Sequence, residues 1–342
     1  MTNESMRVLK LFLFLYIIVC VGCLAVSSCA SDQKRDEKKT VTAKAQSRPY
    51  ELLVVANKDW LKTDVGQVLV EMAEAPIEGL PQMEKNFRVT YINPDAFNGT
   101  FKVYSNIIFA EVGKKYAETE MRMVRNEYCR PQLIVFLSAP DGQSFVDLVQ
   151  GRGQQILDMF NEQEFVRERA SLEKKYSRAV AQQAKKQFGV SVKAPANIDE
   201  IKVGKDFFWA SDGKRENRTN VCLYTLPMRD LTMEDFVAAR DSVMKINIPG
   251  GREDQWMETD SRTVICRIVE RNGQQVMEIR GLWDMRNDAM GGPFVSYVQA
   301  DATGQKLLVA EGFVFAPEEN KRAMVRQLEA ALQTIDTHSD AQ

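Results

Sequence analysis

The alternation of apolar and polar positions divides the chain into an apolar run, a charged segment and a long mixed body. The run from Leu11 to Val26 carries no charge, and residues 30–49 are rich in charge and poor in apolar side chains. From Tyr50 onward, apolar residues recur at every second position or at helical spacing. Because these periods belong to half-buried strands and amphipathic helices, the body is predicted to fold and the charged segment is not.

Runs rich in β-branched and aromatic side chains predict strands in both halves of the body. They are 50–56, 87–93, 101–112, 131–139, 190–193, 205–211, 220–226, 263–271, 275–285, 294–301 and 306–315. Apolar stripes at helical spacing predict helices between them. These are 58–75, 144–188 and 233–246, the second with an interruption at Gly151 and Gly153. A last helix has Pro317 near its first position, and the negative charges of Glu318 and Glu319 complement the dipole at its N-terminus. Strands separated by helices without strict alternation favour an α+β fold, with largely antiparallel sheet and packed helices.

The last predicted strand is apolar on both faces except at Glu311. Such a strand belongs in the middle of a sheet, and we expect the C-terminal helix to cover one of its sides. An unpaired buried carboxylate is costly, so Glu311 must reach an arginine or the margin of the sheet. The alternative is a cleft that favours its protonated form, which would make Glu311 a weak candidate for acid chemistry.

The end of the apolar run predicts where the protein resides. Arg7 and Lys10 precede the run, which is shorter than the ~20 residues of a comfortable transmembrane helix, as is typical of a signal peptide. The stretch VSSC that ends at Cys29 resembles the lipobox of bacterial lipoproteins, in which the cysteine thiol takes a diacylglycerol group before cleavage. We therefore predict lipidation of Cys29. An uncleaved anchor, or an ordinary signal peptide with a chance cysteine, is the alternative.

Lipidation at this position sets the domain organisation. Residues 1–28 would be a cleaved signal peptide, 29–49 a flexible lipidated tether, and 50–342 the body, with a subdivision near residue 189 left open. Two or more acyl chains anchor a protein stably in a membrane. Ala30 follows the cysteine where inner-membrane lipoproteins usually carry Asp. The expected location is therefore a bacterial cell envelope, at the outer membrane.

Charge and histidine content exclude several function classes. The 45 basic and 47 acidic side chains nearly cancel, and nucleic acid binding needs a basic face, so no nucleic acid partner is expected. The single histidine, His338, lies in a polar tail. Its isolation excludes Ser-His-Asp and Cys-His nucleophiles and histidine-ligated zinc. No calcium loop occurs either, so neither a metal nor a cofactor is expected.

Two short patterns resemble catalytic or nucleotide motifs. The stretch from Ser211 to Lys214 matches S-x-x-K, but it lies between two strand-like runs and is predicted to be a hairpin loop. Gly151 and Gly153 lack the third glycine of a nucleotide fingerprint and follow no strand. After loss of the signal peptide and acylation, Cys129, Cys222 and Cys266 remain, the last two as buried strand residues; whether a disulfide forms among them stays open.

Two weak binding candidates follow from loop chemistry. Trp256 lies with Arg252 in the polar segment 249–262, where an exposed aromatic residue could anchor a sugar or a protein. A role in pinning the loop to the core is the favoured alternative. Gly291 and Gly292 are predicted to make a tight turn between two strands, and glycines there could also let a ligand approach the backbone.

The C-terminal part carries a resemblance to a known family. RGLWDMRNDAMGGPFVSYVQAD, followed by LVAEGFVFAPEENKRAMVRQLEAALQTI, resembles a Bacteroidetes family of lipoproteins defined only by a domain of unknown function. The likeness is most specific from Ile279 to Ile335. It supports the lipobox and implies no activity that could be carried over.

Together these patterns favour a membrane-anchored envelope lipoprotein that acts as a non-catalytic binding or structural module. Its partner would be an envelope protein or glycan. The alternative is a histidine-independent hydrolase that acts on envelope glycans through two carboxylates, which would lie roughly 5–9.5 Å apart in an open cleft.

Overall fold

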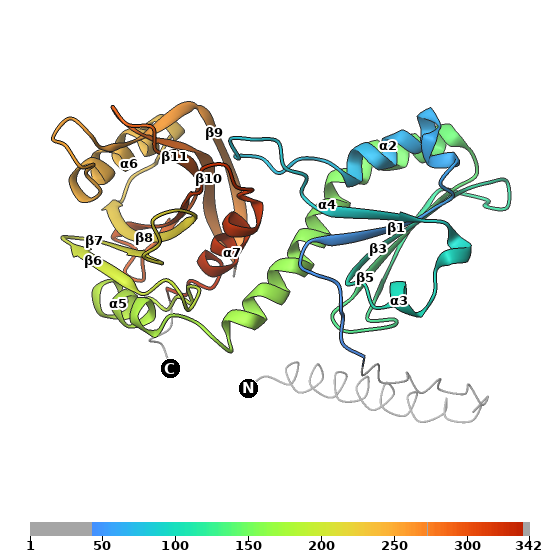
Figure 1. The fold of residues 1–342 in the computed structure, drawn as a ribbon, viewed down its shortest axis with the longest axis horizontal. Helices are drawn as coiled ribbons and strands as arrows, with labels where there is room; N and C mark the ends of the chain where they lie inside the picture. The colour runs from blue at the N-terminus through green and yellow to red at the C-terminus, as the bar shows by residue number, and fades with distance from the viewer. Residues whose placement is uncertain (1–42, 272, 338–342) are drawn as a thin grey trace, which may run out of the picture. The chain divides into compact units, whose positions relative to one another are not determined.

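The structure is a computed structural model that describes residues 43–271 and 273–337 (Figure 1). The predicted signal peptide, the lipidation site Cys29 and His338 lie outside the described residues. Among the described helices, none combines the length and apolar content needed to cross a membrane. The body consists of an N-terminal lobe, residues 43–173, and a C-terminal lobe, residues 177–337, each with its own sheet.

Five strands form the sheet of the N-terminal lobe, in the order β2-β1-β3-β5-β4. They are β1 (Glu51–Val55), β2 (Arg88–Ile92), β3 (Asn106–Val112), β4 (Glu120–Arg125) and β5 (Leu133–Ala139). β1 pairs in parallel with β2 and β3, and β3 pairs in parallel with β5, whereas β4 runs antiparallel to β5. This sheet therefore departs from the antiparallel expectation, because crossovers such as the one through α2 (Asp64–Ala73) return the chain to the same end of the sheet.

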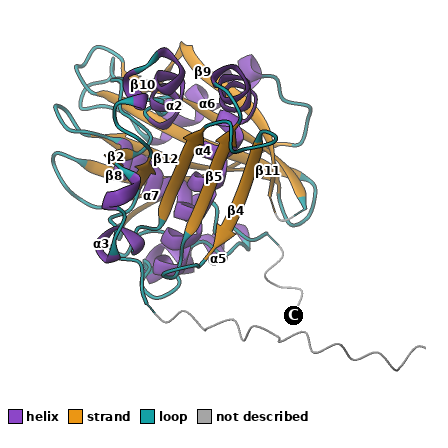
Figure 2. Cartoon of the chain, turned by 90° about the vertical axis from the view of Figure 1, so that its right-hand side faces the viewer, coloured by secondary structure: helices purple, strands orange, loops and turns teal. Residues whose placement is uncertain are grey.

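Helices cover the two faces of this sheet unequally. α2 and α4 (Gly142–Leu172) pack on one face, and the short α3 (Gly99–Lys102) lies on the other. α4 runs through Gly151 and Gly153 without the predicted interruption. A Cβ at Gly153 would lie 2.9 Å from the side chain of Met72, so this glycine lets two helices pack closely. Figure 2 turns this lobe toward the viewer.

Several boundaries in residues 43–188 differ from the sequence prediction. The strand predicted from residue 101 begins at Asn106, because Asn98 caps α3 through the backbone N–H of Thr100. The long helical tract divides where Ser177 caps α5 (Arg178–Phe188). The last part of the predicted tether, residues 43–49, belongs to the body: the Arg130 N–H donates to the Ala43 carbonyl at 2.8 Å.

Seven strands form the sheet of the C-terminal lobe, in the order β6-β7-β8-β12-β11-β10-β9. They are β6 (Glu200–Gly204), β7 (Phe207–Ser211), β8 (Arg218–Pro227), β9 (Met257–Arg271), β10 (Gln274–Met285), β11 (Gly291–Ala300) and β12 (Lys306–Phe315). Every neighbouring pair is antiparallel. The α+β class is therefore confirmed. The segment predicted as a strand at 190–193 makes only an isolated bridge, between Ser191 and Asp336.

Helices bury both faces of the second sheet. α6 (Met233–Asn247) covers one face, and α5 and α7 (Arg322–Leu332) cover the other. β12 lies in the interior of the sheet with α7 on one side, as its two apolar faces predicted. The apolar stripe of α7 packs onto β12 so closely that a Cβ at Gly312 would lie 2.8 Å from Leu328.

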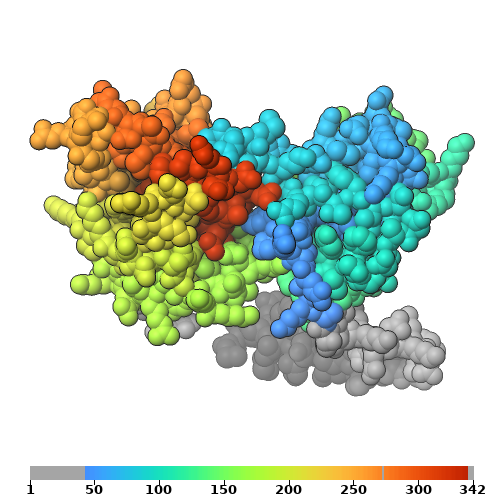
Figure 3. Space-filling model, in the orientation of Figure 1, coloured from blue at the N-terminus to red at the C-terminus, as the bar shows by residue number. Residues whose placement is uncertain are grey.

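The start of α7 is fixed by the other lobe. The helix begins at Arg322, not near Pro317, and Glu318 has a left-handed φ of 63°. The two carboxylate oxygens of Glu84 accept hydrogen bonds from the backbone N–H groups of Lys321 and Arg322, at 2.7 and 3.0 Å. Glu84 thus supplies the negative charge that the sequence assigned to Glu318 and Glu319. The C-terminal residues accordingly adjoin residues of the N-terminal lobe in the space-filling view (Figure 3).

Candidate functional site

Glu311 reaches an arginine, the first of the arrangements expected for it. Its carboxylate is fully buried and accepts two hydrogen bonds from Arg240, from Nε at 3.0 Å and from Nη2 at 2.8 Å. The Ser296 hydroxyl donates a third, at 2.8 Å. With both oxygens bound inside the lobe, Glu311 has the geometry of a structural ion pair and not of an acid in a cleft.

Arg240, which lies on α6, connects Glu311 of β12 to Thr259 of β9. Its Nη1 donates to the Thr259 hydroxyl at 2.8 Å, and that hydroxyl donates to Asp241 at 2.6 Å. Burial acts to lower the pKa of Arg240, but the charge of Glu311 and its hydrogen bonds outweigh it, so the pKa lies above the ordinary value. Burial raises the pKa of Asp241.

Trp256 and Arg252 lie in a loop that is held against the β10–β11 turn. The indole of Trp256 is half-buried between Lys245, 3.8 Å from the ring centroid, and Arg286, at 4.8 Å. Arg252 donates to the Asn287 carbonyl at 2.9 Å. These contacts favour the interpretation that Trp256 holds the loop in place, because the cationic side chains of Lys245 and Arg286 already lie over its ring.

Gly291 and Gly292 lie at the start of β11 and not in the turn itself. The turn is made by residues 286–290, in which Asn287 takes the left-handed conformation at φ 55°. A Cβ at Gly292 would lie 2.0 Å from the Val314 carbonyl oxygen, so this position needs glycine for strand packing. Both glycines border an open concavity of about 920 Å³, which neither Trp256 nor Arg252 lines.

The remaining residues that the sequence analysis considered are Ser211 and three cysteines. Ser211 ends β7, and its hydroxyl accepts from the Gly213 N–H at 3.0 Å in the loop that leads to β8, which is the predicted hairpin. Cys129 and Cys222 are buried free thiols. Cys266 is also free but exposed, contrary to the predicted burial, because it lies on the outermost strand of the sheet, β9.

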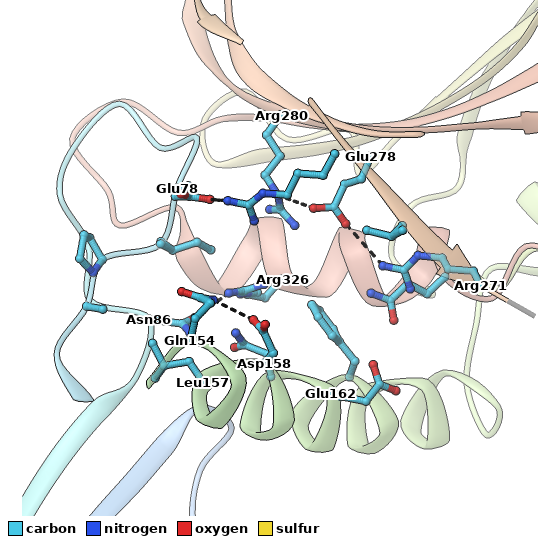
Figure 4. A pocket seen from close by; sticks show the side chains of 18 residues that line it. Glu78, Asn86, Gln154, Leu157, Asp158, Glu162, Arg271, Glu278, Arg280 and Arg326 are labelled. Carbon is cyan, nitrogen blue, oxygen red and sulfur yellow. Dashed lines mark hydrogen bonds and ion pairs between the residues drawn. The ribbon is translucent and has the colours of Figure 1, made fainter. Parts of the chain in front are cut away.

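A polar cavity of about 540 Å³ lies where the two lobes meet (Figure 4). We call it the inter-lobe cavity. The N-terminal lobe contributes residues 75–78 and Asn86 and the α4 residues between 154 and 165. The C-terminal lobe contributes side chains of β9 and β10, together with Arg326 of α7 and Gln333 just beyond it. Both lobes are therefore needed to form it.

The wall formed by the C-terminal lobe is rich in arginine. Arg280 donates to Glu278 at 2.9 Å and pairs with Glu329, and Arg271 approaches Glu278 at 3.5 Å. Arg326 donates to Glu329 at 3.0 Å and to Asn86 of the other lobe at 2.6 Å. The buried charges on this wall thus hold one another in place and are tied to the N-terminal lobe.

These contacts keep the wall charged. Burial acts to raise the pKa of Glu278, but the charges of Arg280 and Arg271 and the hydrogen bonds from Arg280 and Tyr297 outweigh it, so the pKa lies below its ordinary value. Burial acts to lower the pKa of Arg280, but the charges of Glu329 and Glu278 raise it further than burial lowers it. The wall therefore presents fixed charges at neutral pH.

The opposite wall is the polar side of α4. In Figure 4 it carries Asp158 and Glu162, which face the arginines. Asp158 accepts from the Gln154 amide at 2.8 Å, and Glu162 pairs with Arg169 at 2.6 Å. Leu157 and Phe165 supply apolar surface between the charged groups. The cavity thus combines two charged walls with an apolar strip.

Some buried donors at this cavity lack a partner within the described protein. They are Nε of Arg271, Nε of Arg326 and Nε2 of Gln333. Buried polar groups are nearly always hydrogen-bonded, so these three donors are exceptions among the residues that line the cavity. A polar cavity of this size between two lobes is a common setting for ligand binding.

A second concavity, of about 710 Å³, lies at the carboxyl ends of β1, β3 and β5. The parallel order β2-β1-β3-β5 places a topological switch point between β1 and β3, where ligands bind in open α/β sheets. Phe109 and Phe136 stack there at 5.0 Å, and the Arg122 guanidinium covers Phe136 at 4.1 Å. Glu111, which also lines this concavity, pairs with Lys115 at 2.6 Å and accepts a hydrogen bond from the Tyr116 hydroxyl at 2.7 Å, so its carboxylate already has partners.

The sequence did not predict the inter-lobe cavity. Its walls come from the stretch 75–86, from α4, from the β9–β10 hairpin and from α7 with Gln333, and pattern analysis treats these separately. One signal was available: Glu278 and Arg280 occupy alternate positions of β10, on the same face as the buried Val276. Two charged residues on a face that should be apolar indicate a buried charge network or a site.

Comparisons with known proteins place a family match on each lobe. No curated protein matches the chain. A solved structure of a mutant of "Protein Mog1" is 11% identical, with a TM-score of 0.30, over 43% of this chain and 90% of that one. Residues 45–173 match the domain of unknown function DUF8532, and residues 177–334 match the domain of unknown function DUF4837. The chain thus carries two adjacent domains of unknown function, one in each lobe.

Proposed function

We propose that the protein is a lipid-anchored module of a bacterial cell envelope, which performs no chemistry of its own but binds an envelope ligand in the inter-lobe cavity. The VSSC stretch at Cys29 supports the anchor. The observation that carries the binding role is the convergence of charged and apolar side chains from both lobes on one cavity of about 540 Å³.

The charge state of Glu278 favours binding over hydrolysis. A general acid must hold its proton near the working pH, which requires a raised carboxyl pKa. Glu278 has a lowered pKa instead. Burial does raise the pKa of Asp241, but that residue lies on α6, hydrogen-bonded to Thr259, and does not line the cavity.

The anchor is tested by metabolic labelling with palmitate. The wild-type chain should incorporate label and sediment with membranes, and Cys29→Ser should do neither. Equal labelling of the two chains would contradict the anchor.

Binding is tested by native mass spectrometry of the full chain extracted from envelopes in mild detergent. Gln154 and Gln155 are neighbouring exposed residues of α4, but only Gln154 lines the cavity. Gln154→Trp should displace a bound ligand mass that wild type and Gln155→Trp retain. The same bound mass in all three chains, or in none, would overturn the cavity as the binding site.

A further inference from the structure

We infer that the inter-lobe cavity takes a small zwitterion, a short peptide with a free ammonium group and a free carboxylate. This inference rests on the proposed function and assigns a chemical class to its ligand. It follows from charge complementarity between the two walls of the cavity.

The arginine wall carries an excess positive charge. Its four guanidinium groups are those of Arg267, Arg271, Arg280 and Arg326. Three carboxylates pair with them: Glu78 binds Arg267, Glu278 binds Arg280, and Glu329 binds both Arg280 and Arg326. Four cations against three anions leave one positive charge unmatched.

Arg271 is the guanidinium that carries this excess. It approaches Glu278 only at 3.5 Å, a longer contact than the 2.9 Å between Glu278 and Arg280. Its other contacts are with Tyr297, whose hydroxyl accepts at 3.1 Å and whose ring centroid lies 4.5 Å from the guanidinium. Its side chain is 24% exposed, so a ligand can reach it. A guanidinium N–H donates a charge-assisted hydrogen bond to a carboxylate.

The α4 wall carries the matching negative charge. Glu162 is neutralised by Arg169. Asp158 accepts a hydrogen bond from the neutral amide of Gln154, and no ion pair to it occurs among the described residues. It is exposed to the cavity and faces the arginine wall (Figure 4). An ammonium group is the complement of this carboxylate.

Apolar side chains line the same cavity as the two charges. Leu157 and Phe165 on α4 and Val269 on β9 provide apolar surface for short side chains. A fully anionic ligand would meet Asp158, and a fully cationic ligand would meet Arg271. A ligand that carries both charges satisfies both walls at once, and its two ends set its orientation.

The test is calorimetric titration of the detergent-solubilised full chain with alanyl-alanine, its N-acetyl form and its C-terminal amide. The free dipeptide should bind, and blocking either end should weaken binding by about tenfold or more, the loss of one charge-assisted contact. These comparisons use the wild-type chain, so they do not depend on the folding of a variant.

Two variants assign each end of the dipeptide to a wall. Asp158→Asn should weaken binding of the free dipeptide as much as N-acetylation does, and should not weaken the N-acetyl form further. Arg271→Gln should show the same relation to the amide. Asp95→Asn and Arg229→Gln change exposed residues outside the cavity and should leave all affinities unchanged.

Equal affinity for free and blocked dipeptides, or no binding of the free dipeptide at millimolar concentration, would overturn the inference. If that happened while Gln154→Trp still displaced a bound mass, the zwitterion assignment alone would fall. If no bound mass were found either, the proposed binding function would fall with it.

Discussion

Removing Arg240 should destabilise the C-terminal lobe severely. Arg240 and Glu311 are both 0% exposed, and two hydrogen bonds of 3.0 and 2.8 Å join them. In Arg240→Met, the Glu311 carboxylate would keep only the Ser296 hydroxyl as a partner. Leaving one member of a buried ion pair unpaired costs about 3–5 kcal/mol.

This magnitude is large enough to measure without ambiguity. At about 2–4 °C per kcal/mol, the midpoint of thermal unfolding should fall by roughly 6–20 °C. The double variant Arg240→Met/Glu311→Leu removes both charges and should recover most of the loss, because replacing a buried pair by apolar side chains is often neutral. Circular dichroism during thermal and urea unfolding of the full chain measures both variants.

Two results would contradict this prediction. A loss below about 1 kcal/mol for Arg240→Met would mean that Glu311 finds another partner or water. A double variant no more stable than the single variant would mean that packing around the guanidinium, which lies 4.1 Å from the ring centroid of Phe294, matters more than its charge.

Three further predictions follow from the packing and the charges. Glu84→Ala removes the carboxylate that caps α7 and should lower the free energy of unfolding by about 1–2 kcal/mol. Glu71→Ala, at an exposed helix position, should change it little, and equal effects of the two substitutions in urea unfolding would contradict the cap. The folded-state pKa of Glu278 lies below its ordinary value of 4.5, so its contribution to stability is present above pH 4.5 and is lost as the pH falls through the folded-state pKa. Glu278→Gln should therefore be less stable than wild type at pH 7, and in urea unfolding the difference should shrink below pH 4.5. A difference that stays constant with pH would contradict this. Gly292→Ala puts a Cβ 2.0 Å from a carbonyl oxygen of β12 and should lower the free energy of unfolding by about 1–3 kcal/mol. In the control Gly113→Ala, the new Cβ meets nothing within 4 Å, so its midpoint of thermal unfolding should stay near that of wild type, and similar midpoints for the two variants would refute the close contact.

Local periodicity predicted the elements that depend on local burial. The strands at 306–315 and 275–285 and the helix at 233–246 match β12, β10 and α6 within about a residue, because each shows its pattern within one short window. Strand direction did not follow from such windows. β1 and β3 pair in parallel because of the chain between them, which apolar alternation does not record.

Features that join distant parts of the chain were missed for the same reason. Glu84 caps a helix 237 positions away, and no spacing rule connects it to Lys321. The walls of the inter-lobe cavity likewise come from α4 and from β9 and β10, segments that lie far apart along the chain. The sequence did identify Glu311 as a buried acid that needs a partner, but it could not name Arg240.

Photocrosslinking in intact cells would show whether a ligand lies between the two lobes in the envelope. A photoreactive residue at Gln154, inside the cavity, is compared with the same residue at Gln155, which does not line it. A ligand bound in the inter-lobe cavity should give an adduct of defined small mass at Gln154 that is absent at Gln155. The same adducts at both positions, or none at Gln154, would contradict it.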